Sequence, residues 1–251
     1  MKNFSYNRNY FINKFVFLFI FSLAMGYLEG TVAVYLRQIY YNNGPIFPLN
    51  TLMTDYYYLV EVAREFATLV MIFAIAYLSG KIFIERFSYF LFVFGAWDII
   101  YYLSLKAIIN WPSDIFEWDL LFLIPLPWLG PVFAPSFTAF LMILISIGIS
   151  YNLVKYDNFK NLKKPQWLLI FFGYLFIFVS FISNFITLIF RNINLIENIN
   201  DVKSLLANYI PSSFNWWIYC LGIGLLFIVI FNLFFTKSKN QKNINLNSVS
   251  K

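Results

Sequence analysis

Six ionisable residues could carry chemistry in this chain because they lie inside or next to long apolar stretches. They are Glu29, Glu61, Arg64, Glu65, Asp98 and Asp119. Ionisable groups are costly within a membrane, and where they occur there they commonly mark a binding site or a proton pathway. These six residues are therefore the candidate ligand or proton site.

Three of the six share about one turn of a predicted helix. Glu61 and Glu65 are four residues apart and Arg64 adjoins them, so one helix face carries two carboxylates and a guanidinium. Arginine stays protonated at any physiological pH and offers several donors in a fork. A carboxylate could therefore pair with Arg64 and remain ionised; the candidates are Glu29, Glu65 and Asp98.

The depths of the charged residues agree across three predicted helices. With a helical rise of about 1.5 Å per residue, Glu29 lies about 10 Å and Asp98 about 8 Å below the outer ends of their spans. Arg64 and Glu65 lie about 10–12 Å below the outer end of theirs. We expect these charges to meet at one level in the outer half of the membrane and to handle a small solute or ion there, with Arg64 meeting an anionic group and the acids coupling protons.

Two other roles are open for the same residues. They could form a buried clamp that fixes helix packing and binds nothing, as in a structural membrane subunit. They could also supply the acid and base of an intramembrane enzyme that acts on a lipid or isoprenoid-like substrate. No spacing in the sequence identifies a reaction or a cofactor.

The residue types present limit the available metal and redox chemistry. The chain has no histidine and a single cysteine, Cys220, which leaves no internal disulfide and no His-based metal or haem site. A hard cation such as Mg²⁺ or Ca²⁺ could join the carboxylates, but the charge of Arg64 would oppose it. We predict no metal site.

The composition indicates that lipid surrounds the elements that position these residues. Hydrophobic residues make up 61% of the 251 residues and charged residues 12%, against about 45–50% and about 25% in soluble domains. The formal charge is +6, but the basic residues lie between apolar runs, where they set membrane topology. We therefore expect membrane lipids, and no nucleic acid, as partners.

Six apolar segments are long enough to cross a bilayer as helices. They are residues 15–36, 57–78, 82–103, 132–151, 167–190 and 214–235. Between the third and fourth, prolines interrupt residues 111–131 and forbid one unbroken helix. We predict an all-α polytopic membrane helix bundle of about six transmembrane helices. The proline-broken segment is expected to be interfacial or re-entrant and to pack against the bundle.

The loops between these spans are strongly asymmetric in charge. Thirteen of the 18 basic residues fall on the side of the two termini and four on the other, with Arg64 inside a span. The positive-inside rule then places both termini in the cytoplasm. We expect the protein to lie in the inner (plasma) membrane. We divide the chain into a cytoplasmic N-terminus (1–14), a transmembrane domain (15–235) and a disordered cytoplasmic tail (236–251). The oligomeric state is left open.

Two further features of the spans and loops are structural. Residues 192–211 form a polar loop with room for a short amphipathic helix. Gly173, Gly222 and Gly224 are interpreted as positions where helices pack closely.

The stretch from Glu61 to Pro135 includes EVAREFATLVM, FGAWDIIYYLSLK and INWPSDIFEWDLLFLIPLPWLGPVFAP. It resembles an uncharacterised family of bacterial multi-pass integral membrane proteins. The resemblance covers less than a third of the chain. It implies a bacterial membrane origin, and it carries over no activity and no catalytic residue.

Overall fold

The computed structural model describes residues 8–41, 47, 55–156 and 161–235. The predicted tail 236–251 and residues 1–7 of the predicted N-terminus lie outside this part of the chain. The described residues form an all-α helix bundle with one small two-stranded sheet. Its long helices are α1 (Arg8–Tyr41), α2 (Asp55–Ser79), α3 (Phe83–Ile109), α4 (Phe133–Lys155), α5 (Lys164–Arg191) and α7 (Trp216–Phe235).

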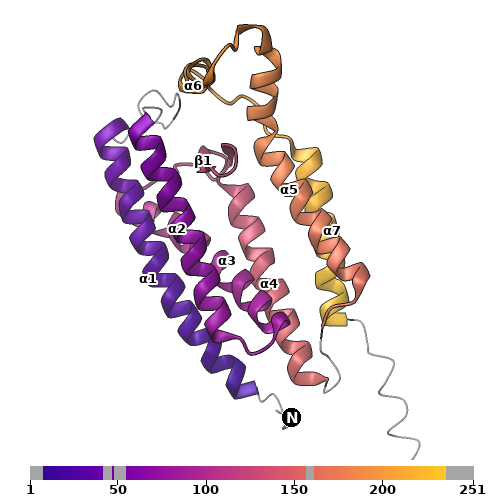
Figure 1. Ribbon diagram of the computed structural model, residues 1–251. Helices are drawn as coiled ribbons and strands as arrows, with labels where there is room; N and C mark the ends of the chain where they lie inside the picture. Colours follow the sequence, from indigo (N-terminus) through magenta and orange to yellow (C-terminus); the bar gives the residue numbers. More distant parts are fainter. Residues whose placement is uncertain (1–7, 42–46, 48–54, 157–160, 236–251) are drawn as a thin grey trace, which may run out of the picture.

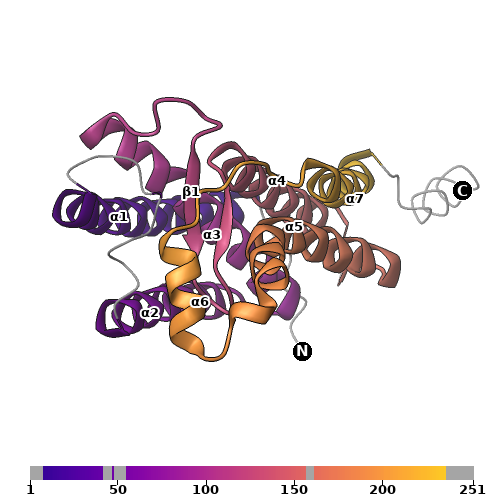
Figure 2. The same ribbon diagram turned by 90° about the horizontal axis from the view of Figure 1, so that it is seen from above.

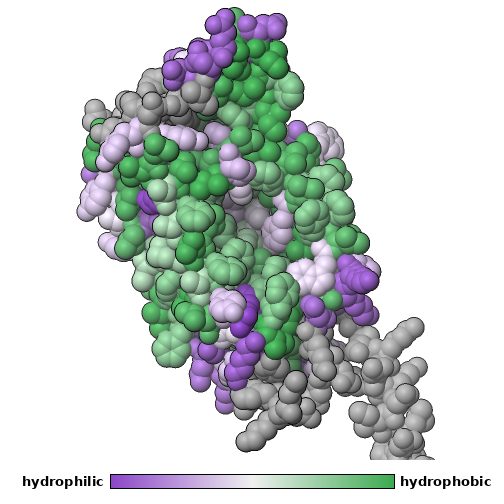
Figure 3. Space-filling view, viewed as in Figure 1, coloured by the Kyte–Doolittle hydropathy of each residue, from purple (hydrophilic) through white to green (hydrophobic). Residues whose placement is uncertain are grey.

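Each of the six predicted spans lies within one of these helices or starts at most two residues before it. Five of the described helices, α1, α3, α4, α5 and α7, are long and apolar enough to cross a membrane. The sixth, α2, has 25 residues and is not among those five. Large apolar side chains cover the outside of the bundle (Figure 3), and Trp217 and Leu78 are 87% and 78% exposed. Such a surface is covered by lipid in a membrane protein.

The helix α3 is central to the bundle. It packs against α1, α2 and α4, while α7 packs against α4 and α5 (Figures 1 and 2). The start of α1 and the end of α7 lie at one end of the bundle, together with the connection from α2 to α3 (Figure 1). The opposite end carries the sheet and α6 (Ile199–Ala207), which is the short helix predicted within 192–211.

Local sequence signals explain where several helices start and stop. Asn110 adopts a left-handed conformation with φ 54° and ends α3, and its N–H donates to the Lys106 carbonyl at 3.1 Å. At the start of α5, the Gln166 side chain accepts a hydrogen bond of 2.9 Å from the Lys163 N–H. A proline in the first turn of α5 needs no N–H partner.

The proline-broken segment forms an antiparallel β-hairpin of β1 (Trp118–Phe122) and β2 (Trp128–Pro131). We predicted an irregular segment packed on the bundle; the packing is confirmed, and the strands are additional. Figure 2 shows the hairpin lying across α3. At Gly130 a Cβ atom would lie 3.0 Å from the Phe181 ring of α5. Leu129 is fully buried, so the hairpin is an internal element.

Glycine allows α5 and α7 to approach closely. A Cβ atom on Gly222 would lie 2.6 Å from the Gly173 carbonyl oxygen, and one on Gly173 would lie 2.7 Å from Leu226. The packing role expected for Gly173 and Gly222 is therefore confirmed. The same expectation is wrong for Gly224, which is exposed, and a Cβ atom added there would have no described atom of a neighbouring element within 4 Å.

The substitution Gly222→Ala is expected to lower the free energy of unfolding by about 1–3 kcal/mol, because the new methyl group forces two backbones apart. The matched control is Gly224→Ala, two residues along the same helix, which is expected to leave stability unchanged or slightly raised. Thermal unfolding of the purified proteins in one detergent compares them. Equal melting temperatures for the two variants would contradict the close α5–α7 contact.

Candidate functional site

A cavity of about 110 Å³ lies between α1, α2, α3 and the hairpin, and we name it the first cavity. It brings together five of the six predicted site residues. Its ionisable lining consists of Glu29, Arg37, Glu61, Arg64, Glu65, Tyr101 and Asp119. The space exceeds what a single water molecule needs, so a small solute or several waters fit.

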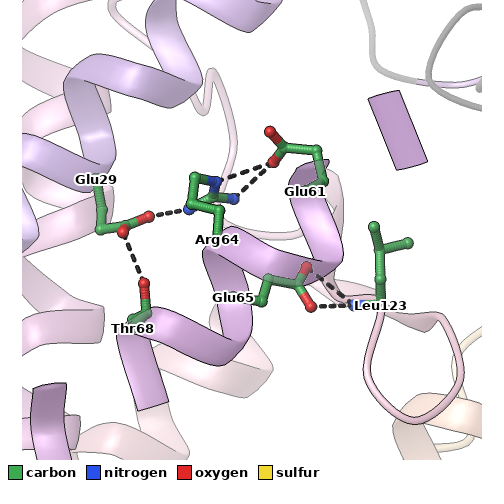
Figure 4. Close-up of polar contacts among 6 residues, drawn as sticks. All are labelled: Glu29, Glu61, Arg64, Glu65, Thr68 and Leu123. Carbon is green, nitrogen blue, oxygen red and sulfur yellow. Dashed lines mark hydrogen bonds and ion pairs between the residues drawn. The ribbon is translucent and has the colours of Figure 1, made fainter. Parts of the chain in front are cut away.

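Arg64 lies at the centre of a polar contact between α1 and α2 (Figure 4). Its guanidinium forms ion pairs with Glu29 of α1 and with Glu61 one turn earlier in α2, the latter at 2.8 Å. The Thr68 hydroxyl donates to the other oxygen of Glu29 at 2.7 Å. Glu29 is almost fully buried, whereas the Arg64 side chain is 30% exposed. Of the three carboxylates named as possible partners of Arg64, Glu29 is the one that pairs with it, and Glu61 is an additional partner.

Glu65 points away from Arg64 and toward the hairpin (Figure 4). Its two carboxylate oxygens accept from the backbone N–H of Leu123, at nitrogen–oxygen distances of 2.8 and 3.0 Å. Glu65 is 7% exposed and forms no ion pair with a residue that the structure describes. It is therefore a buried carboxylate held by one amide and balanced by no direct cation among those residues.

A second ion pair joins α1 to the hairpin. The Arg37 guanidinium lies 3.3 Å from Asp119 of β1, and the Tyr102 hydroxyl donates to the same carboxylate at 3.1 Å. The guanidinium also stacks on the Trp111 ring, 3.5 Å from its centre. Burial raises the pKa of the Asp119 carboxyl, and Arg37 acts in the opposite direction. Asp119 thus lines the first cavity as the ion-pair partner of Arg37.

Asp98 does not join the Arg64 cluster, contrary to our prediction. It lines a different cavity, while its neighbour Trp97 lines the first one. Successive residues of a helix point about 100° apart, because one turn takes 3.6 residues. The depth of Asp98 along its helix follows from its position in the sequence, but the direction of its side chain around the helix axis does not.

Arg37 is a further residue of the site that is not among the six predicted from the sequence, because it directly follows the predicted span 15–36. The structure places it inside α1 and 4% exposed. The sequence contains a signal: Glu29, Ala33 and Arg37 follow one another at intervals of four residues, and all three line the first cavity.

The chemistry of the first cavity follows from its charges. Four carboxylates face two guanidinium groups, which leaves a formal excess of two negative charges when all are ionised. Both arginines already have carboxylate partners. In the part of the chain that the structure describes, no group of three or more His, Cys, Asp or Glu is arranged to hold a metal ion. The arrangement can accept a proton or a small cationic group.

Comparison with known proteins gives no match to a family model, to a curated protein or to a solved structure.

Proposed function

We propose that this membrane protein binds a small cationic solute or ion in the first cavity, as part of transport or sensing. One observation carries the proposal: the carboxylates that line the cavity outnumber the arginines, and Glu65 has no cationic partner among the described residues. An ionised carboxylate in a poorly solvated site needs a compensating charge. A proton, a monovalent cation or an organic ammonium group supplies it.

The same charges argue against an anionic ligand. Of the two arginines that line the cavity, Arg64 is the one with a partly exposed side chain, and two carboxylates already neutralise it. An anion would have to displace Glu29 or Glu61, which would leave a buried carboxylate unpaired at considerable cost.

We place the site in the outer half of a bacterial plasma membrane, with the start of α1 and the end of α7 on the cytoplasmic side. The end of the bundle that holds these helix termini also carries Lys81, Arg86 and Lys164, and basic residues favour the cytoplasmic side. A reporter enzyme fused after residue 251 tests the orientation.

A purely structural role for the same residues is the main competitor. Its support is the contact in which Arg64 and Thr68 of α2 both bind Glu29 of α1. Glu65 discriminates between the two roles, because its carboxylate contributes to the charge of the cavity without joining α1 to α2, and a glutamine in its place keeps an oxygen that accepts from the Leu123 N–H.

The test replaces Glu65 by glutamine and measures binding of small cations. The purified protein is titrated with the chlorides of sodium, potassium, ammonium and methylammonium, and saturable changes in melting temperature are recorded. We expect at least one of these cations to stabilise the unmodified protein. Glu65→Gln is expected to weaken that binding about 10-fold to 100-fold, because a hydrogen bond to a charged group contributes about 1.5–3 kcal/mol.

The control is Glu85→Gln, which alters another buried carboxyl in the first turn of α3. That turn lies at the end of the bundle opposite to the sheet (Figure 1). Glu85→Gln is expected to retain cation binding. Stabilisation of Glu65→Gln equal to that of the unmodified protein would overturn the proposal. Loss of folding in Glu65→Gln, with no cation effect on the unmodified protein, would assign the cluster to structure.

A further inference from the structure

A second cavity, of about 240 Å³, lies on the other side of the hairpin, between α3, α4 and α5. On the face drawn in Figure 3, the molecule is hollowed between the apolar surfaces of α2 and α5. The walls of the second cavity come from the elements beneath that hollow, and Leu121 and Phe122 of β1 line both cavities. The second cavity is distinct from the site proposed above and shares none of its charged residues.

Three residues give the second cavity unsatisfied hydrogen-bonding capacity. They are Asp98 of α3, Trp128 of β2 and Tyr174 of α5. The Asp98 Oδ2, the Trp128 Nε1 and the Tyr174 hydroxyl are all buried, and none has a hydrogen-bond partner among the described residues. A buried polar group without a partner is destabilising, so single cases are uncommon in folded proteins. Three of them from three elements around one cavity indicate a ligand that carries a polar group.

The donors and acceptors define that polar group. The Trp128 N–H can only donate, the Tyr174 hydroxyl can donate, and Asp98 accepts when ionised. A hydroxyl group accepts two hydrogen bonds and donates one, which satisfies all three atoms. An ammonium group has no acceptor for the Trp128 and Tyr174 donors. A carboxylate or phosphate has no donor when ionised, and its charge is repelled by an ionised Asp98.

The rest of the lining defines the body of the ligand. It consists mainly of aromatic and aliphatic side chains, including Phe94, Phe122, Met142, Ile177, Phe178 and Phe181. Such a surface gains free energy by covering an apolar chain. We propose that the second cavity binds the hydroxyl end of a long-chain alcohol dissolved in the membrane, which enters between the apolar surfaces of α2 and α5.

The experiment compares three amphiphiles that share one chain and differ in their head group. The purified protein in lipid nanodiscs is titrated with 1-dodecanol, dodecylamine and dodecanoic acid, and its melting temperature is recorded. We expect saturable stabilisation by dodecanol and a weaker or absent effect of the other two. A dodecanol analogue with a terminal diazirine is expected to label peptides of α3, α4 or α5 on irradiation.

Two variants alter the cavity. Tyr174→Phe removes one unpartnered hydroxyl, so the free protein is expected to be as stable as before or more so. Its apparent affinity for dodecanol is expected to fall about 3-fold to 10-fold, the worth of one neutral hydrogen bond. Ala139→Leu fills part of the cavity and is expected to abolish saturable binding; if it does not fold, Tyr174→Phe decides alone.

The matched control is Tyr209→Phe, which removes a tyrosine hydroxyl that donates to Asn184 at the sheet end of the bundle. It is expected to bind dodecanol as the unmodified protein does. Equal stabilisation by all three amphiphiles would overturn the proposal. The proposal would also be overturned if dodecanol had no saturable effect, or if Tyr174→Phe bound dodecanol with unchanged affinity. Glu65→Gln, which tests the first cavity, is expected to retain dodecanol binding.

Discussion

Replacing Arg37 by methionine is expected to lower the free energy of unfolding by about 3–5 kcal/mol, the largest effect that we expect of any single substitution. The side chains of Arg37 and Asp119 are 5% and 2% exposed. Without the guanidinium, the Asp119 carboxylate stays buried with only the Tyr102 hydroxyl as a described side-chain partner. The hairpin also loses its ionic contact with α1. Unfolding by increasing SDS in mixed micelles, followed by circular dichroism, measures the change.

A second substitution tests the cause of that loss. Asp119→Asn removes the orphaned charge and keeps an oxygen that accepts from Tyr102, so the double variant with Arg37→Met is expected to recover most of the lost stability. Arg191→Met, at an exposed position at the end of α5, serves as the control and is expected to change stability by less than about 0.5 kcal/mol. If the double variant is no more stable than Arg37→Met, the loss does not arise from an unpaired carboxylate.

Replacing Arg64 by methionine is expected to cost about 3 kcal/mol, at the lower end of the range for breaking a buried ion pair. The lower value reflects the 30% exposure of the Arg64 side chain. Glu29 then keeps only the Thr68 hydroxyl as a described side-chain partner, and α1 and α2 lose the ion pair that joins them. The same unfolding measurement in mixed micelles applies.

The two carboxylates that bind Arg64 provide internal comparisons. Glu29→Gln in the Arg64→Met background is expected to restore most of the stability, because the amide still accepts from Thr68. Glu61→Gln alone is expected to cost less than about 1 kcal/mol, since an i,i+3 pair within one helix contributes little. A larger loss for Glu61→Gln than for Arg64→Met would show that the contact with Glu29 is not the important one.

The long helices could be predicted from the sequence because each contains an apolar segment long enough to cross a bilayer. Each of the six predicted spans overlaps one observed helix along almost its whole length; residues 82–103, for example, became Phe83–Ile109. The hairpin was not predicted as strands. Its prolines identified a break, but the pairing of Asp119 with Gly130 and of Leu120 with Leu129 brings together residues from two sides of a turn. Such pairing depends on the neighbouring helices as well as on local sequence.

The contacts of the candidate site could be predicted from the sequence only where the depth of a charged residue in the membrane decides its partner. Glu29 and Arg64 meet as expected because both lie at one level and on facing sides of α1 and α2. Asp98, for which a similar level was predicted, faces another cavity. The partner of Glu65 is a backbone N–H of the hairpin, which no charge pattern identifies. Side-chain direction around the helix axis requires knowledge of which helices are neighbours, and one sequence does not supply it.

The strand β1 lies between the first and second cavities, and side chains that line the first cavity bind it. Glu65 holds the residue that follows β1, Arg37 holds Asp119 within it, and Leu121 and Phe122 line both cavities. An occupant that shifts this strand in one cavity therefore alters the shape of the other. Thermodynamic linkage requires the effect to be mutual and equal in both directions. Occupancy by lipid would then tune the affinity for cations, and occupancy by cations would tune the retention of lipid.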